Sequence, residues 1–347
     1  MGVFVIAEAG VNHNGDLALA LDLVEAAAQA GADAVKFQIF KAAALATAAA
    51  PKAGYQRRTT AGAESQVEML RGLELGEDDF RVLAERCSER GIRFLASPFD
   101  EASLDFLVQE LDVPVLKLPS GEITNGPFLV RAAQSGRPII LSTGMSTLDE
   151  VRDALGLLAW GYGGKKGPVP EDLAILRDRI TLLHCTSEYP APFQDVNLRA
   201  MDTMRAAFGL PVGFSDHTPG IAAALAATAL GATVVEKHFT LDRGLPGPDH
   251  RASLEPGELA AMVEGIRQVE AALGDGVKTP RSSELETRAV ARRSLVAIRP
   301  IRKGEALTAD NLGAKRPGGG LSPMRFWDLE GRPASRDYGL DEPIAED

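Results

Sequence analysis

The sequence predicts an α/β protein: a (β/α)8 (TIM) barrel followed by a small β-rich module. From residue 3 to about residue 273, a short β-branched apolar segment, a loop and an Ala/Leu-rich helical segment follow one another repeatedly. The unit recurs eight times, which is the number that builds such a barrel. After residue 274 the chain becomes polar and loses this period.

The candidate strands are nearly continuous apolar runs, which is typical of parallel strands covered by helices. A doubly wound open sheet is the alternative, but it needs no eighth strand. It also predicts a Gly-x-Gly-x-x-Gly turn after the first strand, and none is present. The strands are expected at 3–9, 34–40, 93–99, 115–120, 138–144, 180–186, 211–217 and 233–239.

Helix-start signals agree with the phase of this repeat. Asp16 and Thr147 each precede an apolar-periodic segment, and Pro256 opens another. The segment 41–76 is long and polar, and we expect an extended loop that covers the active face of the barrel. The predicted organisation is a barrel at 1–274, a polar linker at 275–287 and a small domain at 288–347.

Composition and charge exclude several classes of protein. Hydrophobic residues make up 45% of the 347 residues and charged residues 24%, as in soluble globular proteins. The net charge of −11 argues against nucleic-acid binding. No apolar run reaches the roughly 18 residues that span a membrane. Two cysteines, Cys87 and Cys185, and a start without an export signal predict a cytoplasmic protein with two buried thiols.

Polar side chains gather where the candidate strands end, which in a barrel is the side of the active site. Three pairs stand two residues apart, so each pair shares one face of its strand. Charged groups are costly among the covering helices, so we expect these pairs in the barrel lumen. The pairs are Lys36/Gln38, Ser215/His217 and Glu236/His238, and further candidates are Glu8, Ser97, Lys117, Ser120, Glu122, Ser142 and Ser187.

His217 and His238 lie at matching depth on strands seven and eight. Two imidazoles can share one divalent cation and leave positions open for substrate oxygens. Hydrogen-bonded lumen histidines without a metal are the alternative. Lys36 and Lys117, with the serines, form a set suited to a phosphate or carboxylate. A buried lysine that forms a Schiff base remains a second interpretation.

Four other residues carry two interpretations each. Glu8 and Glu122 are candidate acid/base groups or simple counter-charges for the lysines. Tyr189 either lines a sugar pocket or packs in the interior. Asp249, in a Gly/Pro-rich loop after strand eight, either recognises hydroxyls or is a turn aspartate.

Seven segments read in order resemble one family: "IAEAGVNHNG", "AVKFQ", "LKLPSGE", "ILSTGM", "LHCTSEYPAP", "GFSDHTPG" and "EKHFTLDRGLPGPDH". Together they resemble the sialic acid synthase (nonulosonate synthase) family. The tail "RRSLVAIRPIRKGEALTADNLGAKRPGGGLSP" is similar to its C-terminal antifreeze-like (SAF) domain. The resemblance extends over essentially the whole chain.

The resemblance implies a condensation of phosphoenolpyruvate (PEP) with N-acetylmannosamine or a 2,4-diacetamido analogue, by C–O cleavage. It implies Mn²⁺ or Mg²⁺ held by His217 and His238. Glu8 is implied to contact the sugar, and Glu122 to position water at C2 of the PEP-derived unit. The implied PEP ligands are Lys36, Ser97, Lys117, Ser120, Ser142, Ser187 and Ser215; the implied sugar contacts also include Gln38, Tyr189, Asp249 and Arg316.

The same resemblance implies a domain-swapped homodimer in which Arg316 meets the sugar in the partner's barrel. Ser97 stands where threonine is common, and Ser187-Glu188 where sialic-specific members often carry Asn-Ile. The second departure is closer to relatives that make legionaminic acid, so N-acetylneuraminate and N,N'-diacetyllegionaminate both stand as products. Two rivals remain: a Schiff-base aldolase, and a glycan- or ice-binding protein with a scaffold barrel.

Overall fold

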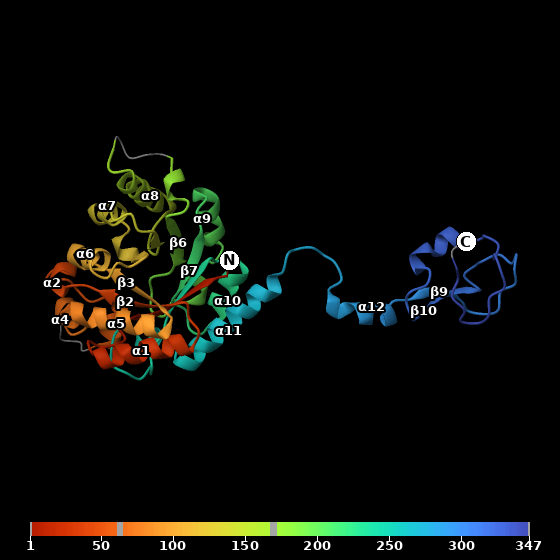
Figure 1. The fold of residues 1–347 in the computed structure, drawn as a ribbon, viewed down its shortest axis with the longest axis horizontal. Helices are drawn as coiled ribbons and strands as arrows, with labels where there is room; N and C mark the ends of the chain where they lie inside the picture. Colours follow the sequence, from red (N-terminus) through yellow and green to blue (C-terminus); the bar gives the residue numbers. More distant parts are fainter. Residues whose placement is uncertain (1, 61–64, 167–171, 346–347) are drawn as a thin grey trace. The chain divides into compact units, whose positions relative to one another are not determined.

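The structure is a computed structural model and describes residues 2–60, 65–166 and 172–345. The chain divides into two compact units, residues 1–274 and residues 275–347 (Figure 1). No helix within the described ranges is long and apolar enough to cross a membrane.

The first unit is a barrel of parallel strands, which confirms the predicted (β/α)8 fold. Its described residues form eight strands that pair in the order β3-β2-β1-β8-β7-β6-β5-β4. β3 and β4 lie next to each other, so the sheet nearly closes. The strands are β1 (Phe4–Gly10), β2 (Ala34–Ile39), β3 (Arg93–Pro98), β4 (Leu116–Leu118), β5 (Ile139–Ser142), β6 (Ile180–Cys185), β7 (Val212–Asp216) and β8 (Val234–His238).

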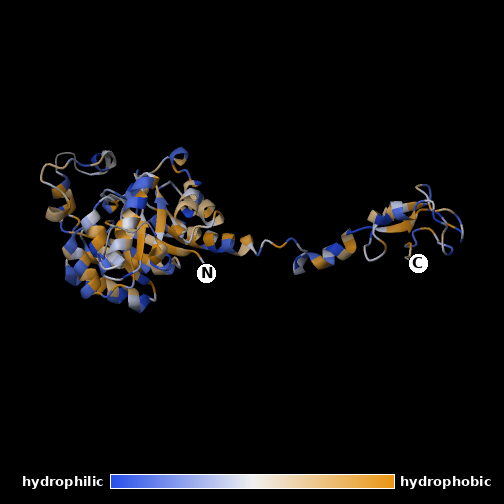
Figure 2. Ribbon diagram, turned by 90° about the horizontal axis from the view of Figure 1, so that it is seen from above, coloured by the Kyte–Doolittle hydropathy of each residue, from blue (hydrophilic) through white to orange (hydrophobic). Residues whose placement is uncertain are grey.

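Helices surround these strands (Figure 1), and the helices carry both hydrophobic and hydrophilic residues (Figure 2). The predicted caps at Asp16 and Thr147 are present, because each side chain accepts a backbone N–H of the first helical turn. The α-helices are α1 (Leu17–Gln29), α5 (Glu77–Arg90), α6 (Glu101–Gln109), α7 (Gly126–Gln134), α8 (Leu148–Tyr162), α9 (Ala200–Phe208), α10 (Ala222–Ala229) and α11 (Pro256–Leu273); the short 3₁₀ turns are η1 (Ser120–Glu122), η2 (Ala174–Leu176), η3 (Phe193–Asp195) and η4 (His250–Ala252).

The segment 41–76, expected as an extended loop, contains three short helices in its described part. Met69, Leu70 and Leu73 pack with Val11 and Phe40 in an apolar cluster. This burial makes the described part of the segment a packed wall beside the ends of β1 and β2. Residues 61–64 of the expected loop lie outside the described residues. The helices are α2 (Ala42–Leu45), α3 (Gly54–Thr59) and α4 (Gln66–Arg71).

The inward faces of the strands begin with an apolar layer that fills one end of the barrel. Because side chains alternate along a strand, the neighbouring residues pack outward against the helices. The inward layer consists of Ile6, Ala34, Leu95, Ile140, Leu183 and Val234, all buried.

The second unit has an apolar core of its own, which includes Leu295, Leu312 and Tyr338. Strands β9 (Ser294–Ala297) and β10 (Leu312–Lys315) pair antiparallel. Residues 275–287, expected as a linker, include η5 (Ser282–Glu284) and the start of α12 (Leu285–Ala291). The remaining elements of this unit are η6 (Pro323–Arg325) and α13 (Phe326–Leu329).

Candidate active site

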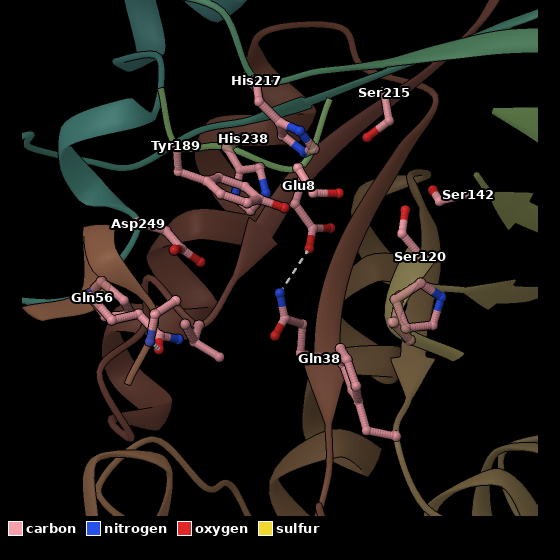
Figure 3. Close-up of a pocket in the computed structure, with 18 of the residues that line it drawn as sticks. Glu8, Gln38, Gln56, Ser120, Ser142, Tyr189, Ser215, His217, His238 and Asp249 are labelled. Atoms are coloured by element: carbon pink, nitrogen blue, oxygen red, sulfur yellow. Dashed lines mark hydrogen bonds between the residues drawn. The ribbon is translucent and has the colours of Figure 1, made fainter. Parts of the chain in front are cut away.

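A cavity of about 410 Å³ lies where the barrel strands end, with side chains of segment 41–76 along one side. Figure 3 shows residues from strands and loops far apart in the sequence converging on it. Thirteen of the fifteen predicted site residues line it: Glu8, Lys36, Gln38, Ser97, Lys117, Ser120, Ser142, Ser187, Tyr189, Ser215, His217, His238 and Asp249.

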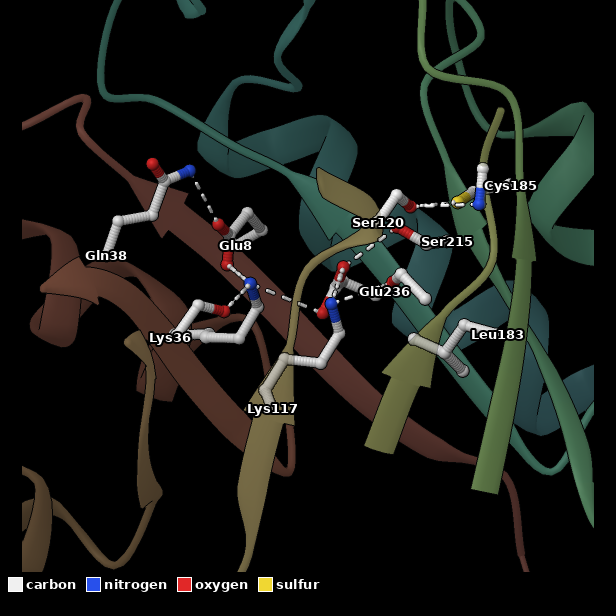
Figure 4. A network of polar contacts seen from close by, with 12 residues as sticks. Glu8, Lys36, Gln38, Lys117, Ser120, Leu183, Cys185, Ser215 and Glu236 are labelled. Carbon is white, nitrogen blue, oxygen red and sulfur yellow. Dashed lines mark hydrogen bonds and ion pairs between the residues drawn. The ribbon is translucent and has the colours of Figure 1, made fainter. Parts of the chain in front are cut away.

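Lys36 on β2 lies at the centre of a buried polar network (Figure 4). Its Nζ is 2.7 Å from Glu8 Oε2 and 3.5 Å from Glu236 Oε2, and it donates to Ser97 Oγ at 3.1 Å. The pairing of β1 with β2 sets Glu8 opposite Lys36, so the register of two adjacent strands creates this ion pair.

Lys117 on β4 shares the same glutamate from the other side. Its Nζ is 3.5 Å from Glu236 Oε1 and donates to Ser142 Oγ at 2.8 Å. Ser215 Oγ also donates to Glu236 Oε1, at 2.8 Å. Glu236 therefore links strands β2, β4, β7 and β8, and two buried lysines flank one carboxylate.

The two buried glutamates have opposite pKa shifts. Burial favours a raised pKa at Glu236, but the nearby Lys117 and Lys36 cations outweigh it and lower the pKa to about 2. At Glu8 burial dominates over the attraction of Lys36 and raises the pKa to about 7. Near neutral pH, Glu236 is therefore ionised, whereas Glu8 is present in both its protonated and its ionised form.

The two lysines also differ. Burial lowers the pKa of Lys117, whereas at Lys36 the two glutamates outweigh burial and raise the pKa. With Glu8 protonated, two cations face one carboxylate. The floor of the cavity then carries a net positive charge, which suits a small anion.

Beside Lys117, glycine and serine form a close cradle. Gly144 N donates to Ser120 Oγ at 2.9 Å, and Ser120 Oγ is 3.2 Å from Cys185 Sγ. A Cβ at position 144 would lie 2.3 Å from Ser187 Oγ and 2.9 Å from Ser120 Oγ, so a side chain there would displace these hydroxyls. Hydroxyls and backbone held this closely are suited to phosphate or carboxylate oxygens.

His217 directly follows β7 and His238 is the last residue of β8, with ring centroids 5.5 Å apart. Burial lowers the pKa of His217 to about 4 and that of His238 well below its ordinary value, so both are neutral near pH 7. His217 Nδ1 lies 2.7 Å from the Thr186 carbonyl and must donate to it, which leaves Nε2 as an acceptor. His238 Nδ1 is buried without a hydrogen-bond partner.

These two side chains fit a divalent cation, which requires neutral imidazoles with available lone pairs. Within the described residues, no group of three or more His, Cys, Asp or Glu side chains is arranged to hold a metal. The protein would therefore supply two ligands and leave the remaining positions to substrate or water.

Three polar side chains lie beside the histidines. The Tyr189 ring packs against His217 with centroids 4.2 Å apart. Asp249 is 6% exposed, and burial raises its pKa to about 6. Gln38 Nε2 donates to Glu8 Oε1 at 3.4 Å. Together they give this end of the cavity donors and acceptors that suit a polyhydroxylated molecule.

Two predicted residues are not among the described residues that line the cavity. Glu122 follows β4 in η1, where its carboxylate accepts from Asn125 Nδ2 at 2.7 Å, and it is not among the described lining residues. Arg316 belongs to the second unit, where it follows β10 and is exposed. Their functional roles stay predictions.

Glu236 is the functional residue to which sequence reasoning gave no role. The signal was present, because Glu236 stands two residues before His238 on one strand face. Its partners Lys36 and Lys117 come from strands distant in sequence, so only the closed barrel identifies it as their shared counter-ion. Segment 41–76 was expected at the active face, but its lining residues Gln56 and Met69 were not singled out from the sequence.

The fold and site define an enzyme of the (β/α)8 class with a charged floor suited to a small anion, beside two neutral histidines. A model described as the NeuB family matches residues 23–278, and one described as the SAF domain matches residues 292–347. The chain belongs to the NeuB family, and the family prediction is confirmed.

Named relatives agree. The N,N'-diacetyllegionaminic acid synthase of Campylobacter jejuni is 50% identical, covering 99% of this chain and 98% of the relative. The protein of that name from Legionella pneumophila is 48% identical over 95% of this chain and 90% of its own length. Human N-acetylneuraminate-9-phosphate synthase is 37% identical, covering 99% and 92%.

Among solved structures, N-acetylneuraminic acid synthetase from Leptospira borgpetersenii in complex with citrate aligns with a TM-score of 0.68 at 37% identity. The alignment covers 83% of this chain and 90% of that one. The predicted enzyme class, a PEP-dependent nonulosonic acid synthase, is confirmed by these relatives. Neither rival, the Schiff-base aldolase or the scaffold barrel, gains support from them.

Proposed function

We propose that this protein condenses PEP with a 2,4-diacetamido sugar and water to give N,N'-diacetyllegionaminate and phosphate. The observation that carries the proposal is the positive cradle of Lys36, Lys117 and serine hydroxyls directly beside the neutral pair His217/His238. The choice of sugar is supported by relatives of that name at 50% and 48% identity, against 37% for the human N-acetylneuraminate-9-phosphate synthase.

PEP occupies the cradle in this proposal. Lys36 and Lys117 supply charge, Ser120, Ser142 and Ser187 supply hydroxyls, and the close approach at Gly144 brings the backbone to the phosphate or carboxylate oxygens. Ser97 and Ser215 hold the lysine–glutamate network around the anion through their bonds to Lys36 and Glu236. The net positive floor orients PEP with C3 toward the sugar.

The acceptor aldehyde lies at the histidine end, with Gln38, Tyr189 and Asp249 as contacts. C3 of PEP forms a bond with the aldehyde carbon, whose oxygen takes a proton. Water adds its oxygen to C2 and loses a proton. The C2–O bond to phosphate then breaks as the new C2 hydroxyl becomes the keto group, and the hydroxyl proton leaves with the phosphate. Glu8, with its pKa near 7, donates the first proton and accepts the second. Glu122 is proposed to position the water.

A divalent cation, Mn²⁺ or Mg²⁺, supplies Lewis-acid activation of the aldehyde when bound. The chain's own contribution is to keep His217 and His238 neutral by burial, and to fix the His217 tautomer through the Thr186 carbonyl. The fixed negative charge of Glu236 and the ionised form of Glu8 stabilise positive charge that develops at C2.

The assembly is proposed to be a domain-swapped homodimer in the cytoplasm, with Arg316 reaching the sugar in the partner's barrel. Its exposure leaves Arg316 accessible to a ligand. Support for a reducing compartment comes from the cysteines, because Cys87 and Cys185 are both free and buried.

Phosphate release from PEP tests the proposal, measured with a 2,4-diacetamido hexose of manno configuration and with N-acetylmannosamine, with and without Mn²⁺. We expect faster release with the diacetamido sugar, loss of release after EDTA treatment and recovery on adding Mn²⁺. Borohydride with pyruvate should trap no lysine adduct. Absence of release with either sugar, or activity that EDTA leaves untouched, would contradict the proposal.

A further inference from the structure

The turn after β1, Asn12-His13-Asn14, belongs to a segment that carries the family resemblance, yet the proposed reaction does not use it. None of the three is among the described residues that line the cavity. Asn12 and His13 are nevertheless 1% and 0% exposed. Buried polar side chains normally have hydrogen-bond partners. Those of Asn12 and Asn14 lie at Phe239 and in the loop after it, whereas His13 Nδ1 accepts from Gly15 N.

That loop, residues 240–254, contributes Pro248 and Asp249 to the cavity. Its two ends are tied together, because Thr240 N donates to Leu254 O at 2.8 Å and Leu254 N donates to His238 O at 2.9 Å. The ends alone do not fix the middle of a fifteen-residue loop. The position of Asp249 therefore depends on what holds the loop between them.

One contact runs through Ser253. Asn12 Nδ2 donates to Phe239 O at 2.8 Å and to Ser253 Oγ at 2.9 Å. Ser253 Oγ in turn donates to the backbone oxygen of Asp249 at 2.7 Å. A continuous chain of buried hydrogen bonds thus links the β1 turn to Asp249.

A second contact runs through His250, which directly follows Asp249 and is 0% exposed. Its Nε2 is 3.2 Å from Asn14 Oδ1, and its Nδ1 is 2.7 Å from Thr240 Oγ1. With the amide oxygen of Asn14 as acceptor, His250 Nε2 is the donor. Its Nδ1 lies against the Thr240 hydroxyl, which also lies 3.2 Å from Asp242 O.

Gly247 packs against this second contact. A Cβ at Gly247 would lie 2.6 Å from His250 Cδ2 and 2.8 Å from Asn14 Oδ1. The loop therefore approaches the β1 turn as closely as backbone allows, and a side chain at this position would separate the two segments.

We propose that the β1 turn is a latch that positions Asp249 for the acceptor sugar. Asn12 and Asn14 are positioning residues that act through Ser253 and His250. The inference rests on the proposed function, which places Asp249 at the acceptor. Weakening the latch is expected to raise the KM for the sugar and to leave the KM for PEP unchanged. The reason is that the lysine–serine cradle shares none of the hydrogen bonds between the β1 turn and residues 240–254.

Asn14→Gly is the sharpest test. Asn14 has φ 51°, a conformation that glycine adopts freely, so the substitution removes the side chain without straining the turn. We expect the KM for the sugar that the wild type uses to rise about fivefold, as for one lost hydrogen bond, with the KM for PEP unchanged. Ser253→Ala should act in the same direction. Asn197→Gly, at an exposed residue with φ 48°, is the matched control and should change neither KM.

Amide hydrogen exchange over residues 240–254 gives a readout that needs no substrate. Asn14→Gly should speed exchange there and leave the strands unchanged. An unchanged sugar KM, or equal rises in both KM values, would overturn the proposal, as would unchanged exchange in this loop. If the wild type releases no phosphate with either sugar, the proposed function fails, and the exchange comparison still decides whether the latch exists.

Discussion

Two successive positions on the inward face of the barrel strands differ sharply in chemistry. The first layer is apolar, and the second layer, two residues further along the same strands, carries the site. Both layers use the same backbone and are almost completely buried. The first holds Ile6, Ala34, Leu95, Ile140, Leu183 and Val234; the second holds Glu8, Lys36, Ser97, Ser142, Cys185 and Glu236.

The difference separates what stabilises the barrel from what performs chemistry. The apolar layer stabilises the folded state through close packing and through the removal of apolar surface from water. The polar layer pairs buried charges, which compensates for their desolvation without adding comparable stability. It persists because the pairing sets the protonation of Glu8 and Glu236 and the positive charge offered to an anion.

Glu236→Gln should have the largest effect. It removes the anion shared by Lys36 and Lys117, so the two cations repel each other and no longer define the cradle. We expect kcat/KM in the phosphate-release assay to fall roughly a hundred- to a thousandfold. Glu264→Gln, on the exposed face of α11, is the control. Activity within a few-fold of wild type would mean that the polar layer is structural.

Leu183→Ala should affect stability instead. Leu183 is fully buried in the apolar layer and is not among the described cavity-lining residues. Truncation should lower the free energy of unfolding by about 3 kcal/mol through lost burial and a residual cavity. Denaturant unfolding measures this, and kcat at 20 °C should stay within about twofold of wild type. A large loss of kcat in the folded variant would show that the two layers are not separable.

In stability, the smallest of the three changes is expected for Glu8→Gln, and it is seen in the pH dependence of the unfolding free energy. The pKa of Glu8 is about 7 in the folded protein against 4.5 ordinarily, so the folded state binds the proton more tightly. The resulting stability is present below pH 4.5 and is lost as pH rises through 7. The variant lacks this loss, so its unfolding free energy relative to wild type should rise by about 2 kcal/mol between pH 5 and pH 8.

Thermal unfolding at matched pH values measures that difference. Parallel stability curves for wild type and Glu8→Gln would contradict a raised pKa at Glu8. Glu236 shifts in the opposite direction, because its pKa is lowered to about 2. Its contribution is present above pH 4.5 and is lost only as pH falls through 2, so it does not interfere in the measured window.

Much of the fold followed from local pattern. The eight predicted strands overlap the observed ones, since apolar β-branched runs between helical segments have few alternatives. The two-residue spacing of Lys36 and Gln38, and of Ser215 and His217, was enough to predict a shared face. The same rule explains why His184 is not among the described cavity-lining residues. It stands between the inward-facing Leu183 and Cys185, and its ring packs on Phe214 with centroids 6.0 Å apart.

Other features could not be predicted from local pattern. The local surroundings of Glu122 were one such feature: it follows β4 in η1, where its carboxylate accepts from Asn125, and its role at the water stays a prediction. The short helices of segment 41–76 were hidden in a polar stretch, because their stability comes from packing on Val11 and Phe40. Turn geometry and tertiary packing decided both.

By itself the sequence determined the number of βα units, the strand face that carries each polar pair, and the family to which the chain belongs. These depend on backbone period and on motifs that lie within a few residues. Only the tertiary structure decided that Glu236 serves two lysines, that Glu8 and Glu236 shift in opposite directions, and that the β1 turn holds Asp249. The pKa values and the latch depend on burial and on partners distant in sequence, which meet when β8 pairs with β1.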